Sequence, residues 1–332
     1  MKIFNSSNVL PLFSFNFSFL AFGAALLVAL IADHYLGEPP TRLHPVVWIG
    51  NYLNWASKQL QPEASPAFRD LKSFWLAAAF WCAGAAMVLI VAYPVQWAAF
   101  QLPWYLAALL LGLALKPMLA WAMLRSEVAA VEVALGQSLD AGRQRLALLV
   151  SRDTAKLNES EVRESAIESL AENLNDSVVA PIFWFVLFGL PGAAIYRFAN
   201  TADAMWGYRG LRSGKNWEWA GKWAARADDV LSWLPARITA LLLVLISGGI
   251  RLRKLSEEAR KTQSPNSGWP MAAMALALGV RLQKPGVYVL NPSGRSPEPK
   301  DTVFAQKNAS KVVIASVICA QASIYLIAFI KP

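Results

Sequence analysis

The sequence is poor in charged residues and cysteine, and each scarcity excludes a class of protein. Only 16% of its 332 residues are charged, whereas 56% are hydrophobic and stand in long blocks. A chain of this composition is expected to be embedded in a membrane. Its two cysteines, Cys82 and Cys319, both lie inside apolar blocks, so they predict neither a disulfide framework nor a metal site.

Signature motifs of soluble nucleotide-binding and hydrolytic enzymes are also missing. The chain contains no GxxxxGK[ST], no GxGxxG after a strand, no HExxH and no GxSxG. The net charge of +9 does not indicate nucleic-acid binding, because the basic residues cluster in regions between the apolar blocks. Such clustering is typical of the cytoplasmic side of a membrane protein. The basic regions are 33–73, 125–177, 201–232 and 251–311.

Six apolar blocks dominate the chain, each near the ~20 residues that a helix needs to cross a bilayer. Trp residues stand beside several of their ends, as in interfacial anchoring. We predict an all-α, polytopic integral membrane protein of one domain, residues 1–332, with about five to six spans or re-entrant segments. We expect the protein to lie in the cell (inner) membrane, with its functional loops on the cytoplasmic side. The blocks are Phe17–Ala32, Phe74–Tyr93, Trp104–Leu124, Val178–Ala199, Trp233–Ile250 and Val312–Ile330.

The basic regions conflict with six simple crossings. The 94–103 connection carries no charge, so we place it outside. If the fourth and fifth blocks both crossed fully, the 201–232 region would also lie outside despite its five basic residues. Pro181, Gly189 and Pro191 favour a break in the fourth block, which then forms a re-entrant pair lining a protein cavity.

A row of acidic residues precedes the fourth block. Wound as a helix, residues 161–176 place one polar set within about 60° of a single line. Only Arg163 interrupts the row, and it points away, although a solvated helix would normally carry more basic partners. Stacked like charges repel unless a cation lies among them, so the row predicts a place for Mg²⁺ and a phosphorylated ligand. A merely solvated acidic face is the alternative. The set comprises Glu161, Glu164, Ser165, Glu168, Glu172, Asn175 and Asp176.

Two further polar clusters stand where apolar blocks end. In D-H-Y-L-G-E-P-P-T-R-L-H, the Gly and Pro residues force a turn beside Arg42 and His44, which can meet an anionic ligand. In Y-R-F-A-N-T-A-D, Asn200 and Asp203 are spaced to complete a Mg²⁺ shell, and Arg197 can grip a phosphate. Packed loop histidines and polar capping of a span are the respective alternatives.

The last two clusters lie in the C-terminal third. Arg226, Asp229 and Arg237 share a helical face, and Arg237 stands inside an apolar stretch, where a charge usually marks a partner or ligand. Simple pairing of Asp229 with Arg226, and snorkelling of Arg237, are the alternatives. Residues 264–291 contain Gly-rich turns around Arg281 that can cradle phosphate through backbone amides.

Taken together, these clusters resemble the adenosylcobinamide-phosphate synthase (CobD/CbiB) family of cobalamin assembly. The resemblance runs from about Ala21 to Asp301. Its carriers are D-H-Y-L-G-E-P-P with H-P-V-V-W-I-G, S-R-D-T-A-K-L with E-S-L-A-E-N and A-P-I-F-W, Y-R-F-A-N-T-A-D-A-M-W-G-Y-R, A-D-D with L-P-A-R-I-T, and S-P-N-S-G-W-P with A-L-G-V-R-L. Several long motifs in one order form a specific signal.

The resemblance implies an ATP-dependent acid–amine ligase. A propionate carboxylate of adenosylcobyric acid would be joined to aminopropanol or its O-phosphate, giving adenosylcobinamide or its phosphate. ATP and Mg²⁺ are the implied cofactors. The implied partners are the corrinoid, the amine, membrane lipid and other cobalamin-assembly enzymes, with no nucleic acid.

Charge and spacing then suggest roles for individual residues. Asp153, Asp229 or Glu168 is the catalytic candidate, because a carboxylate must accept the ammonium proton before the amine attacks. The metal candidates are Glu168, Glu172, Asp176 and Asp203. The candidates for binding substrate and phosphate are Arg42, His44, Arg152, Arg197, Asn200, Arg209, Arg237 and Arg281.

Three other functions remain open from the sequence. One is a non-catalytic sensor or regulatory relative of the same superfamily. Another is a Mg²⁺-dependent membrane transferase, such as a prenyltransferase, although Asn175-Asp176 lacks the second Asp of an N-D-x-x-D motif. A transporter is the last, but polar motifs gathered on one side favour surface chemistry.

Overall fold

A computed structural model describes residues 10–60, 69–212 and 214–330. Helices dominate these residues, as predicted, and only two short β-hairpins interrupt them. The helices, with η marking 3₁₀ and π segments, are α1 (Leu10–Leu36), η2 (Thr41–Leu43), α2 (Pro45–Gln59), α3 (Leu71–Phe100), α4 (Trp104–Leu115), η3 (Lys116–Met118), α5 (Trp121–Leu135), α6 (Leu139–Leu146), α7 (Glu159–Leu174), η4 (Asn175–Val179), α8 (Ala180–Trp206), α9 (Trp217–Ala220), α10 (Lys222–Ser247), α11 (Leu252–Ala259), α12 (Gly268–Leu278) and α13 (Pro299–Ile330).

The strands form two antiparallel pairs. In the first, β1 (Leu211–Arg212) pairs with β2 (Lys215–Asn216), and in the second, β3 (Leu282–Lys284) pairs with β4 (Tyr288–Leu290). Both pairs lie in loops that the sequence marked as basic rather than in apolar blocks. They therefore leave the prediction of an all-α membrane fold intact.

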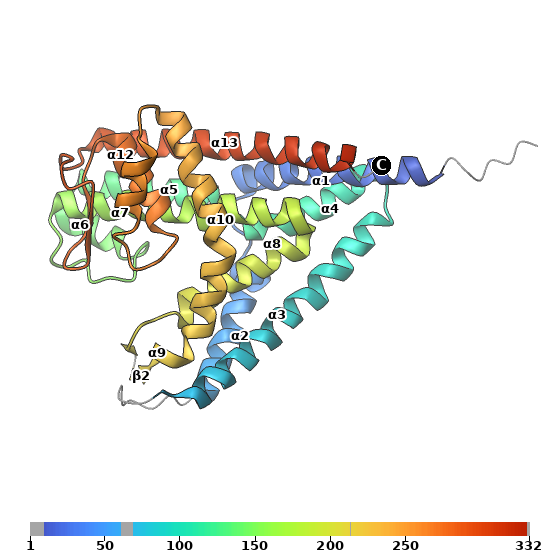
Figure 1. The fold of residues 1–332 in the computed structure, drawn as a ribbon, viewed down its shortest axis with the longest axis horizontal. Coiled ribbons are helices and arrows are strands. Elements are labelled where there is room, and N and C mark those ends of the chain that lie inside the picture. Colours follow the sequence, from blue (N-terminus) through green and yellow to red (C-terminus); the bar gives the residue numbers. More distant parts are fainter. Residues whose placement is uncertain (1–9, 61–68, 213, 331–332) are drawn as a thin grey trace, which may run out of the picture.

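Six long apolar segments in the described residues have the length and composition to cross a membrane, which confirms the polytopic prediction. Each contains most or all of one predicted block. The segments are Phe19–Leu36, Leu71–Phe100, Trp104–Leu135, Glu159–Trp206, Lys222–Ser247 and Pro299–Ile330. Figure 1 shows that α1, α4 and α13 run lengthwise together, with the α3–α4 connection and the C-terminus at one end of the molecule.

The fourth block folds back on itself at Gly189. This residue has φ 67° and ψ −154°, a non-helical conformation that divides α8 into two arms. Beyond the break, Arg197 Nη1 donates to Ser177 Oγ at 3.2 Å, although the two residues are 20 positions apart. The arms therefore form a hairpin, which lies beside α3 in Figure 1. The predicted break is confirmed, and Gly189 is its position.

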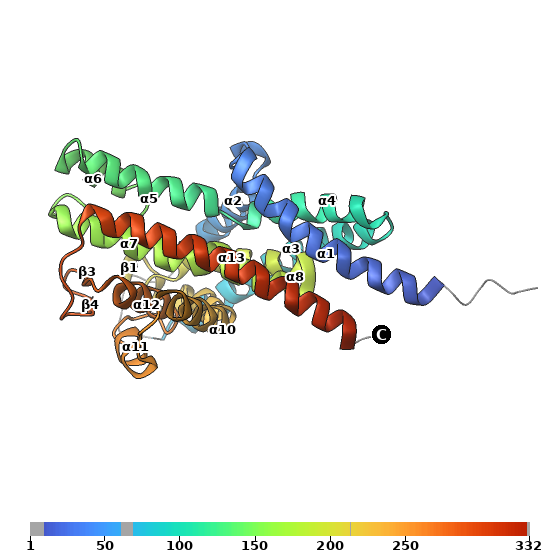
Figure 2. The same ribbon diagram turned by 90° about the horizontal axis from the view of Figure 1, so that it is seen from above.

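The opposite end of the molecule gathers the shorter helices. Figure 2 shows α5, α6 and α7 beside the first part of α13, with α11, α12 and the β3–β4 hairpin next to them. A continuous core of buried Ala, Leu and Val side chains joins this end to the long helices. The acidic row on α7 thus lies where the bundle of long helices meets the cluster of short ones.

Candidate active site

The acidic row is buried at its centre and half-buried at Glu161, Glu172 and Asp176. The Glu164 and Glu168 side chains belong to residues only 0% and 1% exposed, so the alternative of a solvated acidic face is wrong for them. Glu161 has a structural task, since its carboxylate accepts the Asn158 backbone N–H while the Asn158 side chain accepts that of Glu161. This reciprocal cap fixes the start of α7.

Two arginines from distant loops neutralise the first half of the row. Arg281 Nη2 lies 3.2 Å from Glu164 Oε1, and Arg152 Nη2 lies 3.1 Å from Glu168 Oε2. Each carboxylate keeps one buried oxygen without a hydrogen-bond partner. Both arginines, predicted to bind phosphate, thus lie at the acidic row, and the unpartnered oxygens leave each ion pair able to accept a further donor.

The β3–β4 hairpin covers the middle of the row. Lys284 of this hairpin attracts the carboxylates of both Glu168 and Glu172. Burial raises the pKa of the Tyr288 phenol, and the neighbouring Glu168 carboxylate raises it further. The Tyr288 hydroxyl is therefore held neutral as a donor. Residues 264–291 supply these side chains from a helix and a hairpin, beyond the phosphate-cradling turns expected from their glycines.

A hydrogen-bonded cluster continues the row at the base of the α8 hairpin. η4 is a π-helical segment, a wider turn that often marks functional sites in proteins. It directs Asp176 toward the returning arm, where the Tyr196 hydroxyl lies 3.4 Å from Asp176 Oδ1. Asn175 Nδ2 donates to the same oxygen at 2.8 Å, and Asn175 Oδ1 accepts the Thr239 hydroxyl at 3.0 Å.

The cluster extends from α8 to α10. The Tyr196 and Ser232 hydroxyl oxygens lie 3.1 Å apart, and Ser232 lies 3.5 Å from both Asp228 oxygens. Asn200 Nδ2 donates to Asp228 Oδ1 at 3.4 Å, and the Asp203 carboxylate interacts electrostatically with those of Asp176 and Asp229. Three predicted site residues, Asp176, Asn200 and Asp203, thus meet at one place.

The predicted polar segment that contains His44 forms a second group of charges, around a buried lysine that sequence reasoning missed. Lys116 Nζ lies 3.0 Å from Glu38 Oε2 and 3.5 Å from Asp33 Oδ1, and the lysine is only 4% exposed. His44 Nε2 lies 3.0 Å from the same Glu38 oxygen. The position of this lysine within the apolar block 104–124 could have revealed it as a candidate site residue, because buried charges in membrane helices are costly and usually functional.

Arg197 links the two groups. Its guanidinium interacts electrostatically with both Glu38 and Asp176, and its buried Nε has no hydrogen-bond partner. The segments around Asp33, Asp176, Asn200 and Asp228 therefore converge. Glu38, Lys116, Tyr196 and Asp228 join the candidate residues of this cluster.

Four predicted residues lie away from this cluster or at its margin. Asp153 is exposed and accepts the Ala155 backbone N–H, and the Arg42 side chain is exposed. Arg209 is exposed and attracts Asp229 at the margin. Arg237 lies between the Trp233 and Trp269 rings, with its guanidinium 4.6 and 4.9 Å from their centroids.

The donor set fits Mg²⁺ shared with a phosphorylated ligand. In the described part of the chain, no three His, Cys, Asp or Glu side chains are grouped so as to hold a metal ion by themselves. Magnesium, however, is usually bound by one or two carboxylates together with substrate phosphates and waters. Glu172 and Asp176 can supply such oxygens, and Arg197 Nε, which has no hydrogen-bond partner among the described residues, can donate to an anionic ligand.

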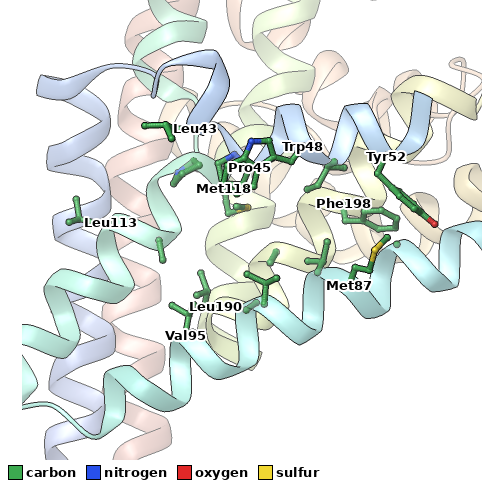
Figure 3. Close-up of a pocket in the computed structure, with 18 residues that line it drawn as sticks. Leu43, Pro45, Trp48, Tyr52, Met87, Val95, Leu113, Met118, Leu190 and Phe198 are labelled. Carbon is green, nitrogen blue, oxygen red and sulfur yellow. The ribbon is translucent and has the colours of Figure 1, made fainter. Parts of the chain in front are cut away.

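An apolar cavity of about 530 Å³ lies beside the buried charges, between α2, α3, η3 and the returning arm of α8. Figure 3 shows Trp48, Met87, Leu190 and Phe198 around it. Its wall residues Pro45, Pro117 and Phe198 are the chain neighbours of His44, Lys116 and Arg197. A large apolar surface and a charged site therefore adjoin.

Fold and site together define a polytopic helical membrane protein with carboxylate, amide and guanidinium groups gathered where the long helices meet the short ones. The chain belongs to the CobD/CbiB family, since the family model described as CobD/Cbib protein matches residues 26–314. It is 37% identical to the probable cobalamin biosynthesis protein CobD of Methanothermobacter thermautotrophicus, over 88% of this chain and 93% of the relative.

Other relatives give the same result. The probable cobalamin biosynthesis protein CobD of Thermococcus kodakarensis is 42% identical over 83% of this chain and 86% of its own length. The cobalamin biosynthesis protein CobD of Chromobacterium violaceum is 40% identical over 77% of this chain and 80% of its own. No solved structure matches the chain. The predicted family and the link to cobalamin biosynthesis are therefore confirmed.

Proposed function

We propose that this protein is an ATP-dependent ligase that joins a propionate carboxylate of adenosylcobyric acid to aminopropanol or its O-phosphate. One observation carries the proposal. The acidic row ends at Asp176 in a hydrogen-bonded, largely half-buried cluster that also holds Asn200, Asp203 and Asp228 and faces the Arg197 guanidinium. Such a cluster offers both metal-binding oxygens and a cation for phosphate.

The reaction divides into two balanced steps. First, a propionate oxygen bonds to a phosphorus of ATP while the bond from that phosphorus to its bridging oxygen breaks. The products are an acyl phosphate and ADP, or an acyl adenylate and pyrophosphate. Next, the amine nitrogen bonds to the acyl carbon, phosphate or AMP leaves, and the amine gives up a proton. Activation is needed because a free carboxylate is a poor acyl donor.

Residues of the cluster can serve each step. Glu172, Asp176 and Asp203 are the proposed metal ligands, and bound Mg²⁺ supplies neutralisation of polyphosphate charge. Arg197, with Lys284 and Arg152 at the row, would hold phosphate oxygens. Asp228 and Asp229 are the proposed proton acceptors, because the amine must be neutral to attack. Asp228 is the better placed, since it lies within the hydrogen-bonded cluster.

The neighbouring cavity suits the other substrate. A corrinoid has apolar faces and a polar amide rim. The cavity walls are apolar, and several wall residues are next in the chain to charged residues of the cluster. We infer that hydrocarbon parts of the ring contact this cavity while one propionate extends to the cluster. The same arrangement explains why a ligase for this substrate is built into a membrane.

The proposal is tested by assaying whether the purified protein, in detergent, joins cobyric acid to the amine. The protein is incubated with ATP, Mg²⁺, a cobyric acid and either aminopropanol or its phosphate, and mass spectrometry measures the condensed corrinoid. Omission of each component is the control. Release of phosphate or of pyrophosphate distinguishes the two activation routes. Absence of the condensed product with every amine would overturn the ligase assignment and favour a non-catalytic relative.

A further inference from the structure

We propose that α10 lies along the membrane surface instead of crossing the bilayer, with its exposed apolar face bound to the acyl chains and headgroups of an anionic leaflet. The first support is its direction. In Figure 1, α10 runs steeply across α1 and α13, and in Figure 2, where α13 still lies lengthwise, α10 is seen nearly end-on. Helices that share a bilayer with α13 should run roughly with it.

The charges of α10 also oppose a full crossing. Lys222, Arg226, Asp228 and Asp229 occupy its first third, and Arg237 follows near its middle. The helical stretch after Arg237 contains ten residues, 238–247, which rise only about 15 Å. This is half of the roughly 30 Å hydrocarbon core of a bilayer. Although α10 has the length and composition of a candidate span, it could therefore cross only with Arg237 inside the bilayer.

The exposed face of α10 has the composition of an interfacial helix. Val230, Trp233, Leu234, Leu241 and Leu245 are exposed along one side at helical spacing. Arg237 stands on the same side between two tryptophan rings, beside a hollow of about 610 Å³ that Arg260 also lines. Apolar side chains flanked by Trp and Arg match the boundary between acyl chains and anionic headgroups.

This placement removes the conflict in the distribution of basic residues. The α8 hairpin turns back at Gly189, so the chain before and after it lies on one side. With α10 at the surface, the regions 33–73, 125–177, 201–232 and 251–311 then all lie on that side. The charge-free 94–103 connection lies on the other. The positive-inside rule identifies the basic side as cytoplasmic.

Labelling of single cysteines by a membrane-impermeant maleimide tests the proposal. It is measured separately in sealed right-side-out and inside-out vesicles. Cys82→Ser and Cys319→Ser remove the native thiols. Arg212→Cys precedes α10, Arg253→Cys follows it, and Asp140→Cys and Gln101→Cys mark the two sides. The positions 101, 140, 212 and 253 are all exposed. Positions 140, 212 and 253 should be labelled from one side and 101 from the other. Labelling of 212 and 253 from opposite sides, or of 140 and 212 from opposite sides, would overturn the proposal.

A depth measurement gives an independent readout on folded protein. Spin labels on cysteines at positions 230, 234, 241 and 245 report the depth of each position through quenching by oxygen and by a polar nickel complex. A surface helix gives a flat profile at the acyl–headgroup boundary. A profile that passes through the bilayer centre would overturn the proposal. Thermal melting in detergent, with the cysteine-free protein as reference, verifies that each variant is folded.

Discussion

Lys116 is buried between two carboxylates, and its removal is expected to be costly. In Lys116→Met, the buried Asp33 and the half-buried Glu38 lose a cation at 3.5 and 3.0 Å, respectively. Removing one partner of a buried ion pair typically costs about 3–5 kcal/mol. We expect a clear fall in the melting temperature of the detergent-solubilised protein. The double variant with Glu38→Gln should recover part of it, because the excess negative charge falls.

The matched control is Lys300→Met. Lys300 pairs with Glu298 at 2.7 Å, but both side chains are more than half exposed. Exposed ion pairs contribute about 0–1 kcal/mol. A loss for Lys116→Met no larger than that for Lys300→Met would contradict the inference that Lys116 neutralises the buried Asp33 carboxylate and its neighbour Glu38.

Asp176 lies at the junction of the acidic row and the α8 hairpin, so its charge is expected to matter for turnover. Asp176→Asn keeps an oxygen that can accept from Tyr196 and Asn175. We therefore expect near-normal melting, with a fall of about 10²-fold or more in kcat for corrinoid condensation, the scale of losing one preorganised electrostatic contact.

Glu159→Gln provides the comparison for Asp176→Asn on the same segment. Its carboxylate is 62% exposed and pairs with Arg163 on the far side of α7 from the row. Turnover should stay near that of the parent protein. Equal activity of the Asp176 and Glu159 variants would remove Asp176 from the proposed metal site.

Single residues differ in how far the sequence reveals them. The spacing of Glu164, Glu168 and Glu172 predicts a single helix, which is local geometry, and α7 contains all three, whereas Asp176 lies in the π-helical η4 that follows. Glu164 pairs with Arg281 and Glu168 pairs with Arg152, and both contacts depend on tertiary packing. Helical periodicity carries no information about such long-range pairs, so both arginines were expected at phosphate instead.

Among the elements, the α8 hairpin depends most on a single glycine. Gly189 has φ 67° and ψ −154°, a region that only glycine occupies readily, and an added Cβ would lie 2.0 Å from Gln96 Oε1. We expect Gly189→Ala to cost about 1–3 kcal/mol from backbone strain. Melting in detergent measures the loss, and Gln96→Ala should relieve only the steric part.

Gly136→Ala is the control for this substitution. Gly136 has φ −65°, and the nearest atom to an added Cβ lies at 3.4 Å. Alanine there is expected to be neutral or slightly stabilising, because it restricts the unfolded chain. Melting of the Gly189 variant as high as that of the Gly136 variant would show that the hairpin does not require the glycine conformation.

The elements show where sequence patterns suffice. Gly and Pro in the fourth block predicted a break, because these residues interrupt helices for local steric reasons. The fifth block looked equally apolar, yet α10 runs across its neighbours in Figure 1. Its direction is set by packing against α8 and α12, and composition alone does not encode a direction.

For the whole molecule, nucleotide and metal are expected to stabilise the fold only together. The described residues contain no compact group of three metal-ligating side chains, so Mg²⁺ alone should leave the melting temperature unchanged. ATP with Mg²⁺ should raise it, by an amount equivalent to about 2.7 kcal/mol at 100 times Kd. Differential scanning fluorimetry with EDTA as control measures both. A rise with Mg²⁺ alone would indicate a preformed metal site.

At the same scale, the family resemblance and the observed convergence are separate sources of evidence. Motif order identified the family, and the match over residues 26–314 confirms it. Neither motif order nor spacing placed Lys116 and Glu38 beside Arg197, because these contacts join segments about 80 to 160 positions apart. The chemistry of the cluster was therefore predictable in kind, and its membership only in part.

The reversal at Gly189 also constrains the length of the chain. Asp176 and Asn200 reach the same cluster from the two arms, 13 residues before the turn and 11 after it. Inserting one helical turn into either arm would displace one of them by about 5.4 Å and rotate little else. Substitutions between these positions are compatible with the cluster, whereas an insertion or deletion there would separate Asp176 from Asn200.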